Sequence, residues 1–264
     1  MPFSYKGAIT FGLVYIPVTL TPAIRENDIG FNMLEKKTLS RVKYKKTCVD
    51  CDGRELASGD IVKGYQYEKG QYVVFTDEDF EKVRSAKDSN ITISAFTDMH
   101  EVDPIYFARA FYVAPTGGER AYALLLRAME KEGRAAIAKT VLGTREALVV
   151  LRVRDGRMLA NTLYYHDEVQ TAPYIQVTEA AKLDKTELDL AVNLINNLGT
   201  KFKPSDYHDE YNARLRAAIE QKIAGLEVEK PQETKSAKII NIMDALKRSI
   251  ELTGGKTKRT GSQR

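Results

Sequence analysis

The chain has 264 residues, of which 43% are hydrophobic, so it can form one large domain or two small ones with a real core. Lys and Arg outnumber Asp and Glu by 40 to 36, and the last eleven residues contain four of those cations and no acid. The rest of the chain is therefore formally neutral. Such a body can bind a polyanion only if its cations gather on one surface.

Composition also excludes several protein classes. No apolar run is long enough to cross a bilayer. The first twelve residues lack the charged segment and apolar block that mark a secretory signal. Two cysteines are too few for a disulfide framework. We therefore expect a cytoplasmic protein that does not interact with a membrane.

Up to about residue 180 the sequence shows mostly the two-residue period of β-strands. In residues 5–20, Gly7 and Gly12 interrupt strand-favouring runs and Pro17 removes a hydrogen-bond donor. Such interruptions are typical of bulges and barrel corners. This segment is therefore predicted to be β-structure.

Two later segments predict β-hairpins. Residues 65–75 alternate Tyr and Val with polar residues around a turn at Lys69 and Gly70. Residues 148–165 form a second pair of strand-like runs, joined by Asp155 and Gly156.

Two helices are predicted in the same part of the chain. Thr76 followed by Asp79 resembles a capping box, which indicates a short helix over residues 77–86. Residues 119–133 are amphipathic and end at a glycine. The apolar stripe of this second helix contains Tyr122, Leu125 and Met129.

After residue 180 the apolar period changes to that of helices. Residues 186–199 and 205–226 predict two amphipathic helices joined by a turn that contains Pro204. Their apolar faces contain Leu188, Val192, Ile195 and Leu198 in the first, and Tyr211, Leu215, Ile219 and Ile223 in the second. Either these helices cover the β-structure of their own chain, or they form an arm that packs on a partner subunit.

The end of the chain predicts a tethered helix. Residues 227–238 are polar and read as a linker, and residues 238–252 form a third amphipathic helix. Its stripe consists of Ile239, Ile242, Met243, Leu246 and Ile250. A short helix of this kind either docks into a groove of a partner or folds back on its own chain.

Signatures of catalysis are missing from the sequence. The three histidines are scattered, and no phosphate-binding loop, nucleophile elbow or zinc-protease motif occurs. The acidic residues 77–81 fall in the first turns of a predicted helix, where they complement the helix dipole. Cys48 and Cys51 form a C-x-x-C pair without a second pair, so they are weak metal candidates, although two copies of the chain could pool their pairs.

A row of cations precedes the cysteines. Residues 40–46 read as a strand in which Arg41, Lys43 and Lys45 alternate with apolar residues, at a spacing of about 6.6 Å. Phosphates recur about every 3.4 Å along one DNA strand, so such a row could contact successive phosphates. The alternative is a solvated edge strand that lysine protects from aggregation. Weaker candidates of the same kind are Lys63, Arg152, Arg154 and Arg157.

Three motifs together resemble the bacterial Ku family of DNA double-strand-break proteins. They are YKGAITFGLVYIPVTL, RVKYKKTCVDC and IVKGYQYEKGQYVVFTDEDF, and the similarity extends through LYYHDEV to INIMDALKRSIE near the end. The resemblance implies a mainly β fold with helices. In that fold a Ku-type β-barrel core is accompanied by short covering helices, a bridging arm and a C-terminal helical arm.

The resemblance also implies a function without catalysis. Two copies would form a ring around a double-stranded DNA end without reading its sequence. The ring would associate with the nucleoid, use no cofactor and recruit a multifunctional ATP-dependent DNA ligase for non-homologous end joining. The implied domains are a barrel with its DNA-encircling bridge (residues 1–180), a dimerisation arm (181–228), and a linker, ligase-recruiting helix and short basic tail (229–264).

Site residues follow from the charge pattern and from the same resemblance, which implies a DNA-backbone role for Arg41, Lys43 and Lys45. DNA-backbone contacts are expected from Arg41, Lys43, Lys45, Lys46, Lys63, Arg152, Arg154, Lys256, Lys258 and Arg259. The dimer arm would use Leu188, Val192, Ile195, Tyr211, Leu215 and Ile219. The ligase would bind Ile239, Ile242, Met243, Leu246 and Ile250.

Two departures from the family pattern matter. Many members carry a further cysteine upstream of the C-x-x-C, where this chain has Lys37, Thr38 and Leu39. Many also end in a long lysine-rich extension, whereas here the sequence stops soon after Arg259. The first departure weakens a zinc site, and the second reduces the expected contacts of the tail with DNA.

Two alternatives from other classes are a metal-dependent nucleic-acid-processing enzyme and a nucleoid-coating protein. The enzyme would use Cys48 and Cys51, or the acidic residues 77–81, as metal ligands. The coating protein would bind internal DNA and would not require an end.

Overall fold

The computed structural model describes residues 5–83, 90–143, 145–171, 184–227 and 242–254. The chain divides into two compact units, Met1–Thr171 and Ala172–Arg264, and each is described by itself.

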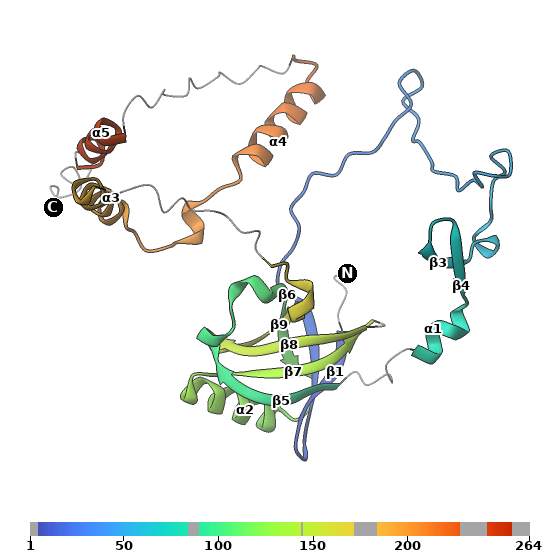
Figure 1. The fold of residues 1–264 in the computed structure, drawn as a ribbon, viewed down its shortest axis with the longest axis horizontal. Helices are drawn as coiled ribbons and strands as arrows, with labels where there is room; N and C mark the ends of the chain where they lie inside the picture. Colours follow the sequence, from blue (N-terminus) through green and yellow to red (C-terminus); the bar gives the residue numbers. More distant parts are fainter. Residues whose placement is uncertain (1–4, 84–89, 144, 172–183, 228–241, 255–264) are drawn as a thin grey trace. The chain divides into compact units, whose positions relative to one another are not determined.

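The first unit contains a closed seven-stranded barrel in the order β1-β2-β6-β9-β8-β7-β5 (Figure 1). Neighbouring strands are antiparallel except β1 and β5, which run parallel. The barrel strands are β1 (Tyr5–Phe11), β2 (Val14–Pro22), β5 (Asn90–Asp98), β6 (Phe107–Pro115), β7 (Arg134–Leu142), β8 (Arg145–Arg154) and β9 (Arg157–Leu163). Closure leaves this sheet without a free edge.

Turn chemistry explains the hairpin of β1 and β2, predicted only as β-structure, and the predicted hairpin of β8 and β9. Gly12 has φ +55° between β1 and β2, a conformation that glycine adopts without strain. Asp155 and Gly156 both have positive φ between β8 and β9, as a tight hairpin turn requires. Pro17 lies opposite Ala8, and its carbonyl accepts a hydrogen bond of 2.9 Å from the backbone N–H of Thr116. Both predicted β-segments are confirmed.

Helix α2 (Glu119–Glu132) packs on the barrel core. Leu125, Leu126 and Met129 are buried in the main apolar cluster, together with residues of β1, β2, β7, β8 and β9. The helix ends at Gly133, which has φ +63°. The predicted helix and its stop are therefore confirmed.

Residues 23–89 connect β2 to β5, and we call them the β2–β5 connection. It contains the hairpin of β3 (Lys63–Glu68) and β4 (Gln71–Phe75), followed by helix α1 (Asp77–Val83). The predicted hairpin with its turn at Lys69 and Gly70 is confirmed, as is the start of the predicted helix at residue 77. Residues 84–86 of that prediction lie outside the described residues. Residues 23–83 are all described, and none of them is buried.

The strand predicted over residues 40–46 is wrong. Arg41 forms an isolated bridge with Leu34, Thr47 forms another with Glu55, and no ladder runs between them. Two tight loops, each closed by its own bridge, take the place of a continuous pair of strands. The segment between them therefore has no neighbour with which to extend a ladder.

The second unit contains helices α3 (Lys185–Leu198), α4 (Glu210–Ile223) and α5 (Ile242–Gly254), with α5 packed against α3. The first and third predicted helices are confirmed where they are described. The second begins later than predicted, because Asp209 caps it by accepting a hydrogen bond of 2.9 Å from the N–H of Asn212. The single-turn 3₁₀ helices within the described residues are Ser58–Asp60, Met99–Glu101, Pro104–Tyr106, His166–Glu168 and Pro204–Asp206.

Candidate nucleic-acid interface

The strongest concentration of positive charge lies in the β2–β5 connection. Residues 36–46, which we call the basic loop, contain six Lys or Arg and no acid. Every residue of the basic loop is exposed. This gathering of cations is what an otherwise neutral chain needs to bind a polyanion.

Glu35 shapes the start of the basic loop. Its carboxylate accepts hydrogen bonds from the N–H of Lys37 at 3.0 Å and from the N–H and hydroxyl of Thr38 at 2.6 and 2.8 Å. These hydrogen bonds, the one from Lys37 first, hold the pKa of Glu35 below its usual value. The turn then returns through Leu39, with φ +55°, to the bridge between Leu34 and Arg41.

The predicted cations of this segment divide into two groups. Within the described residues, Arg41, Lys43 and Lys46 are exposed and take part in no ion pair. Lys45 is different, because its Nζ lies 2.7 Å from a carboxylate oxygen of Glu55. Three of the four are therefore available to a phosphate, whereas the charge of Lys45 is largely balanced.

Sequence reasoning missed two residues of this surface. Lys36 and Lys37 begin the basic loop and are exposed beside the predicted cations. The signal that reveals them is the absence of any acid between Glu35 and Asp50, not an alternation of charges.

A second loop follows the basic loop and presents the two cysteines. Its backbone is fixed by hydrogen bonds from Cys48 N–H to the carbonyl of Arg54 at 2.9 Å and from Arg54 N–H to the carbonyl of Cys51 at 3.0 Å. The neighbouring Cys48 thiol raises the pKa of Cys51 by hydrogen bonding. Among the described residues, no group of three or more His, Cys, Asp or Glu could hold a metal ion.

The other predicted cations lie in different surroundings. Lys63 begins β3 and places its Nζ 4.5 Å from the centre of the Phe80 ring. Arg152 is half-buried on β8, where its Nε donates to Asn161 at 2.9 Å, and burial lowers its pKa, with a further contribution from Arg154. Arg154 is exposed and lies 3.6 Å from the carboxylate of Asp155. None of these three is as free as Arg41, Lys43 and Lys46 of the basic loop.

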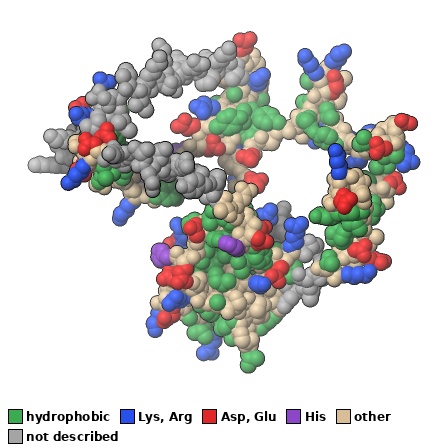
Figure 2. Space-filling model, in the orientation of Figure 1, with side chains coloured by type: hydrophobic (Ala, Val, Ile, Leu, Met, Phe, Trp, Pro, Cys, Tyr) green, Lys and Arg blue, Asp and Glu red, His purple; other side chains and the backbone are tan. Residues whose placement is uncertain are grey.

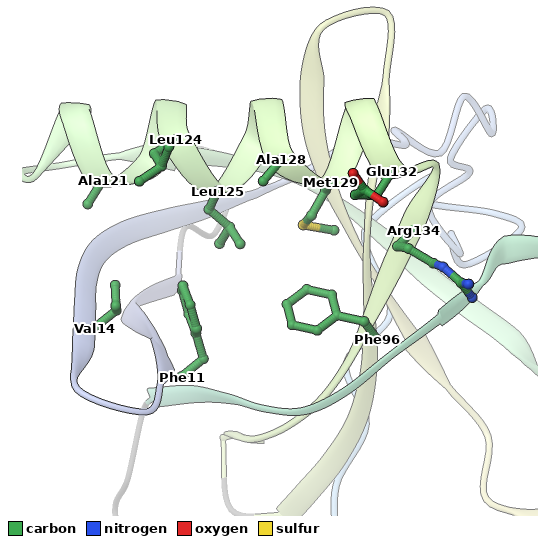
Figure 3. Close-up of a pocket in the computed structure, with 10 residues that line it drawn as sticks. All are labelled: Phe11, Val14, Phe96, Ala121, Leu124, Leu125, Ala128, Met129, Glu132 and Arg134. Atoms are coloured by element: carbon green, nitrogen blue, oxygen red, sulfur yellow. The ribbon is translucent and has the colours of Figure 1, made fainter.

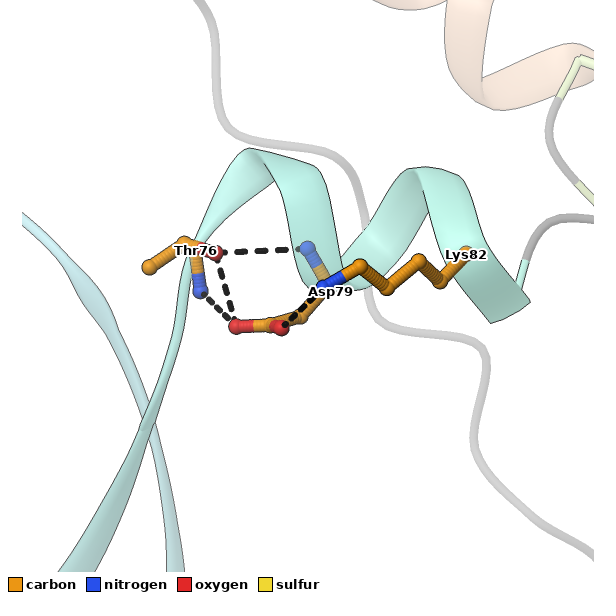
Figure 4. A network of polar contacts seen from close by, with 3 residues as sticks. All are labelled: Thr76, Asp79 and Lys82. Atoms are coloured by element: carbon orange, nitrogen blue, oxygen red, sulfur yellow. Dashed lines mark hydrogen bonds and ion pairs between the residues drawn. The ribbon is translucent and has the colours of Figure 1, made fainter.

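The acidic residues after β4 have a structural role at the start of α1. The carboxylate of Asp79 accepts hydrogen bonds from the N–H and hydroxyl of Thr76 at 3.0 and 2.7 Å, and the hydroxyl accepts one from the Asp79 N–H at 3.2 Å (Figure 4). The capping box predicted from the sequence is confirmed. These hydrogen bonds lower the pKa of Asp79.

An apolar pocket of about 510 Å³ lies between α2, the β1–β2 turn and the strands β5 and β7 (Figure 3). Phe11, Phe96 and Met129 line it, and Glu132 and Arg134 stand at one end. Because most of its wall is hydrocarbon, this pocket offers little to a phosphate.

The predicted arm and tail residues are only partly described. Leu188, Val192, Ile195 and Tyr211 are exposed, and Leu215 and Ile219 are half-buried. Leu246 and Ile250 are half-buried on α5, the helix that packs against α3. Ile242 and Met243 belong to α5, but their side chains lie outside the described part. Ile239, Lys256, Lys258 and Arg259 lie outside it altogether.

Comparison with known proteins decides the family. A family model described as the Ku70/Ku80 β-barrel domain matches residues 10–190. The chain belongs to the Ku family. The match includes the complete β2–β5 connection and every barrel strand except residues 5–9 of β1, so the predicted fold class of a Ku-type β-barrel with helices is confirmed.

Several curated Ku proteins are similar over nearly the whole chain. A non-homologous end joining protein Ku of Lachnoclostridium phytofermentans is 41% identical over 94% of this chain and 96% of its own length. The protein of the same name from Solibacter usitatus is 39% identical over 98% of this chain and 97% of its own. The protein of that name from Bacillus subtilis is 35% identical over 94% of this chain and 81% of its own length. No helix in the described parts of this Ku chain is long and apolar enough to span a membrane.

Proposed function

We propose that this chain binds the ends of broken double-stranded DNA, without reading their sequence, in non-homologous end joining. Relatives that are similar over nearly the full length of the chain are named for that process. The observation that supports binding most directly is the basic loop, with six exposed cations and no acid. Lys and Arg side chains of this kind neutralise phosphates, which are the same for every sequence.

We further propose that the binding form is a homodimeric ring. Helices α3 and α4 support this proposal, because neither has a buried residue and both expose apolar side chains. Isolated helices shorter than about 12–15 residues are marginal in water, so α4, and the apolar side chains of α3 that stay exposed beside α5, require a surface to cover. A second copy of the chain is the proposed partner.

A third part of the proposal concerns an ATP-dependent DNA ligase, which the ring would recruit through α5. The support is the amphipathic stripe of α5, two of whose described residues, Leu246 and Ile250, are half-buried. Because α5 packs against α3, the ligase would either bind the exposed remainder of the pair or displace α5 from α3.

A comparison of linear and closed circular DNA tests the ring. Purified protein is mixed with a labelled linear duplex and challenged with equal masses of unlabelled linear or covalently closed plasmid. If the ring loads only at a DNA end, the linear competitor removes it from the labelled duplex, and the closed circle removes hardly any. Equal competition would refute end loading and favour a protein that coats internal DNA.

A mass measurement in solution accompanies this assay. Sedimentation equilibrium or light scattering is expected to give twice the mass of 29.7 kDa for the free protein. A monomer at every concentration would refute the ring whatever the DNA competition shows.

A further inference from the structure

The β3–β4 hairpin is a two-stranded sheet with both of its outer edges unpaired among the described residues. Isolated hairpins are marginally stable in water and need a third strand or an apolar cover. Helix α1 covers one end of the hairpin, where the rings of Phe75 and Phe80 lie 5.5 Å apart. No other described residue gives the rest of the hairpin such a cover.

The side chains of the hairpin are apolar and exposed. Tyr65 and Tyr72 are 67% and 60% exposed, and Val73 and Val74 are 45% and 52% exposed. Figure 2 shows hydrophobic side chains on the surface of this part of the connection. Tyr65 and Val73 pair across the hairpin and share one face, and Tyr72 and Val74 lie on the other, so both faces expose apolar side chains. Exposed apolar surface of this kind marks an interaction site.

The two edges of the hairpin differ in their protection. Strand β3 has a charged residue at each end, Lys63 and Glu68, whereas β4, with the sequence QYVVF, has neither charge nor proline. Natural proteins guard free edges with charge, proline, bulges or cover, so that an unguarded apolar edge invites another strand. The edge of β4 is therefore the one that a partner strand would join.

Charge decides which class of partner fits. Residues 61–83, which include the hairpin and α1, contain three Lys and five acidic residues. This net negative charge repels nucleic acid, in contrast to the basic loop. A strand of a protein is favoured, and β4 itself is an uncharged strand of matching pattern.

We propose that β4 pairs antiparallel with β4 of a second copy, so that two hairpins form one four-stranded sheet in the order β3-β4-β4-β3. Val73 would lie opposite Val73 of the partner subunit, and Tyr72 opposite Val74 of the partner subunit. Antiparallel pairing places the two acidic α1 helices at opposite ends of the sheet, whereas parallel pairing would bring them together. This inference rests on the proposed homodimer, and it assigns a contact to the connection that carries the basic loop.

Disulfide trapping tests the pairing. Val73→Cys is introduced into a background in which Cys48 and Cys51 are replaced by Ser, and the full-length protein is oxidised with copper phenanthroline. Opposed residues of an antiparallel pair have Cα atoms about 4.5–5.5 Å apart, within the range that a disulfide spans. We expect a covalent dimer on a non-reducing gel.

Tyr65→Cys is the matched control. Tyr65 lies directly across the hairpin from Val73 and is at least as exposed. In the proposed sheet the two copies of β3 are separated by three strand spacings, about 14 Å, so Tyr65→Cys forms no disulfide. Trapping of Tyr65→Cys in place of Val73→Cys would show that β3 forms the joint, and would overturn the proposal.

A second variant tests the same contact without thiols. Val73→Lys places like charges opposite each other and is expected to raise the dimer dissociation constant at least ~10-fold, while Val73→Thr leaves it nearly unchanged. Protein that sediments as a dimer but gives no trapping and no effect of Val73→Lys would overturn the pairing and leave the proposed ring intact. If DNA with single-stranded overhangs shields Val73→Cys from alkylation while no covalent dimer forms, the hairpin binds nucleic acid and the pairing is again overturned. Protein that is monomeric at every concentration would refute both the β4 pairing and the proposed ring.

Discussion

Replacing Arg41, Lys43 and Lys46 together by Gln removes three exposed cations that no ion pair among the described residues engages. Each phosphate that a protein neutralises contributes about 0.9 to the slope of log K against log salt. If each cation meets one phosphate in each of two subunits, the magnitude of the slope falls by about 5. Between about 50 and 200 mM salt, the loss of affinity then becomes roughly a thousandfold smaller for the variant than for the unmodified protein.

The assay is fluorescence anisotropy of a short blunt duplex, titrated at several salt concentrations. Because the three side chains are exposed, the variant should keep its thermal midpoint. The control is Lys45→Gln combined with Glu55→Gln, which removes the pair joined at 2.7 Å and leaves the net charge unchanged. Its slope should match that of the unmodified protein. A triple variant with an unaltered slope, or with a loss confined to particular sequences, would refute the assignment of the basic loop to phosphates.

Three further predictions follow from the barrel, the cap of α1 and the tail. Leu151→Ala removes a fully buried core side chain and should lower the free energy of unfolding by about 2–5 kcal/mol in urea denaturation, whereas Leu13→Ala, at a fully exposed turn, should change it by less than about 0.5 kcal/mol. The pKa of Asp79 is lower in the folded protein than the usual 3.8, so this carboxylate stabilises α1 above pH 3.8 and loses that effect as the pH falls through the lowered pKa. Amide exchange in α1 should accelerate in that pH range. Asp79→Asn should remove this pH dependence. Deleting residues 238–264 should leave end binding intact and reduce stimulation of an ATP-dependent ligase, and full stimulation by the shortened protein would contradict recruitment through this segment.

The hairpins could be predicted because turn-forming residues mark their turns in the sequence. Gly70 and Gly156 have positive φ at the predicted turns, and Gly133 has positive φ at the predicted helix end; Gly12, predicted only as an interruption of β-structure, also has positive φ and forms the turn between β1 and β2. The strands β5, β6 and β7 have no such local signal. Strand β7, for instance, begins with Arg134, Ala135 and Ala136, a composition that favours helices as much as strands. It is a strand because it pairs with β5 and β8, contacts that lie outside any local window.

The site was predictable in composition and not in pairing. The cations of residues 40–46 were visible in the sequence, but their regular alternation suggested a strand that does not form. The ion pair between Lys45 and Glu55 depends on the bridge between Thr47 and Glu55, which brings residues ten positions apart together. Such a contact follows from the loop conformation and not from the charges themselves.

The barrel does not depend on the β2–β5 connection for its core. Strands β2 and β5 flank β1, where Leu20 pairs with Tyr5 at the start of the strand and Asn90 pairs with Ala8 at its middle. Leu20 and Asn90 are separated by two strand spacings, about 10 Å across the sheet, and by three residues, about 10 Å along β1, so an artificial linker of several residues could join β2 to β5. Since residues 23–83 add no buried side chain, the barrel should fold without them. Natural variation can therefore change the length, charge or conformation of the β2–β5 connection while the barrel stays the same.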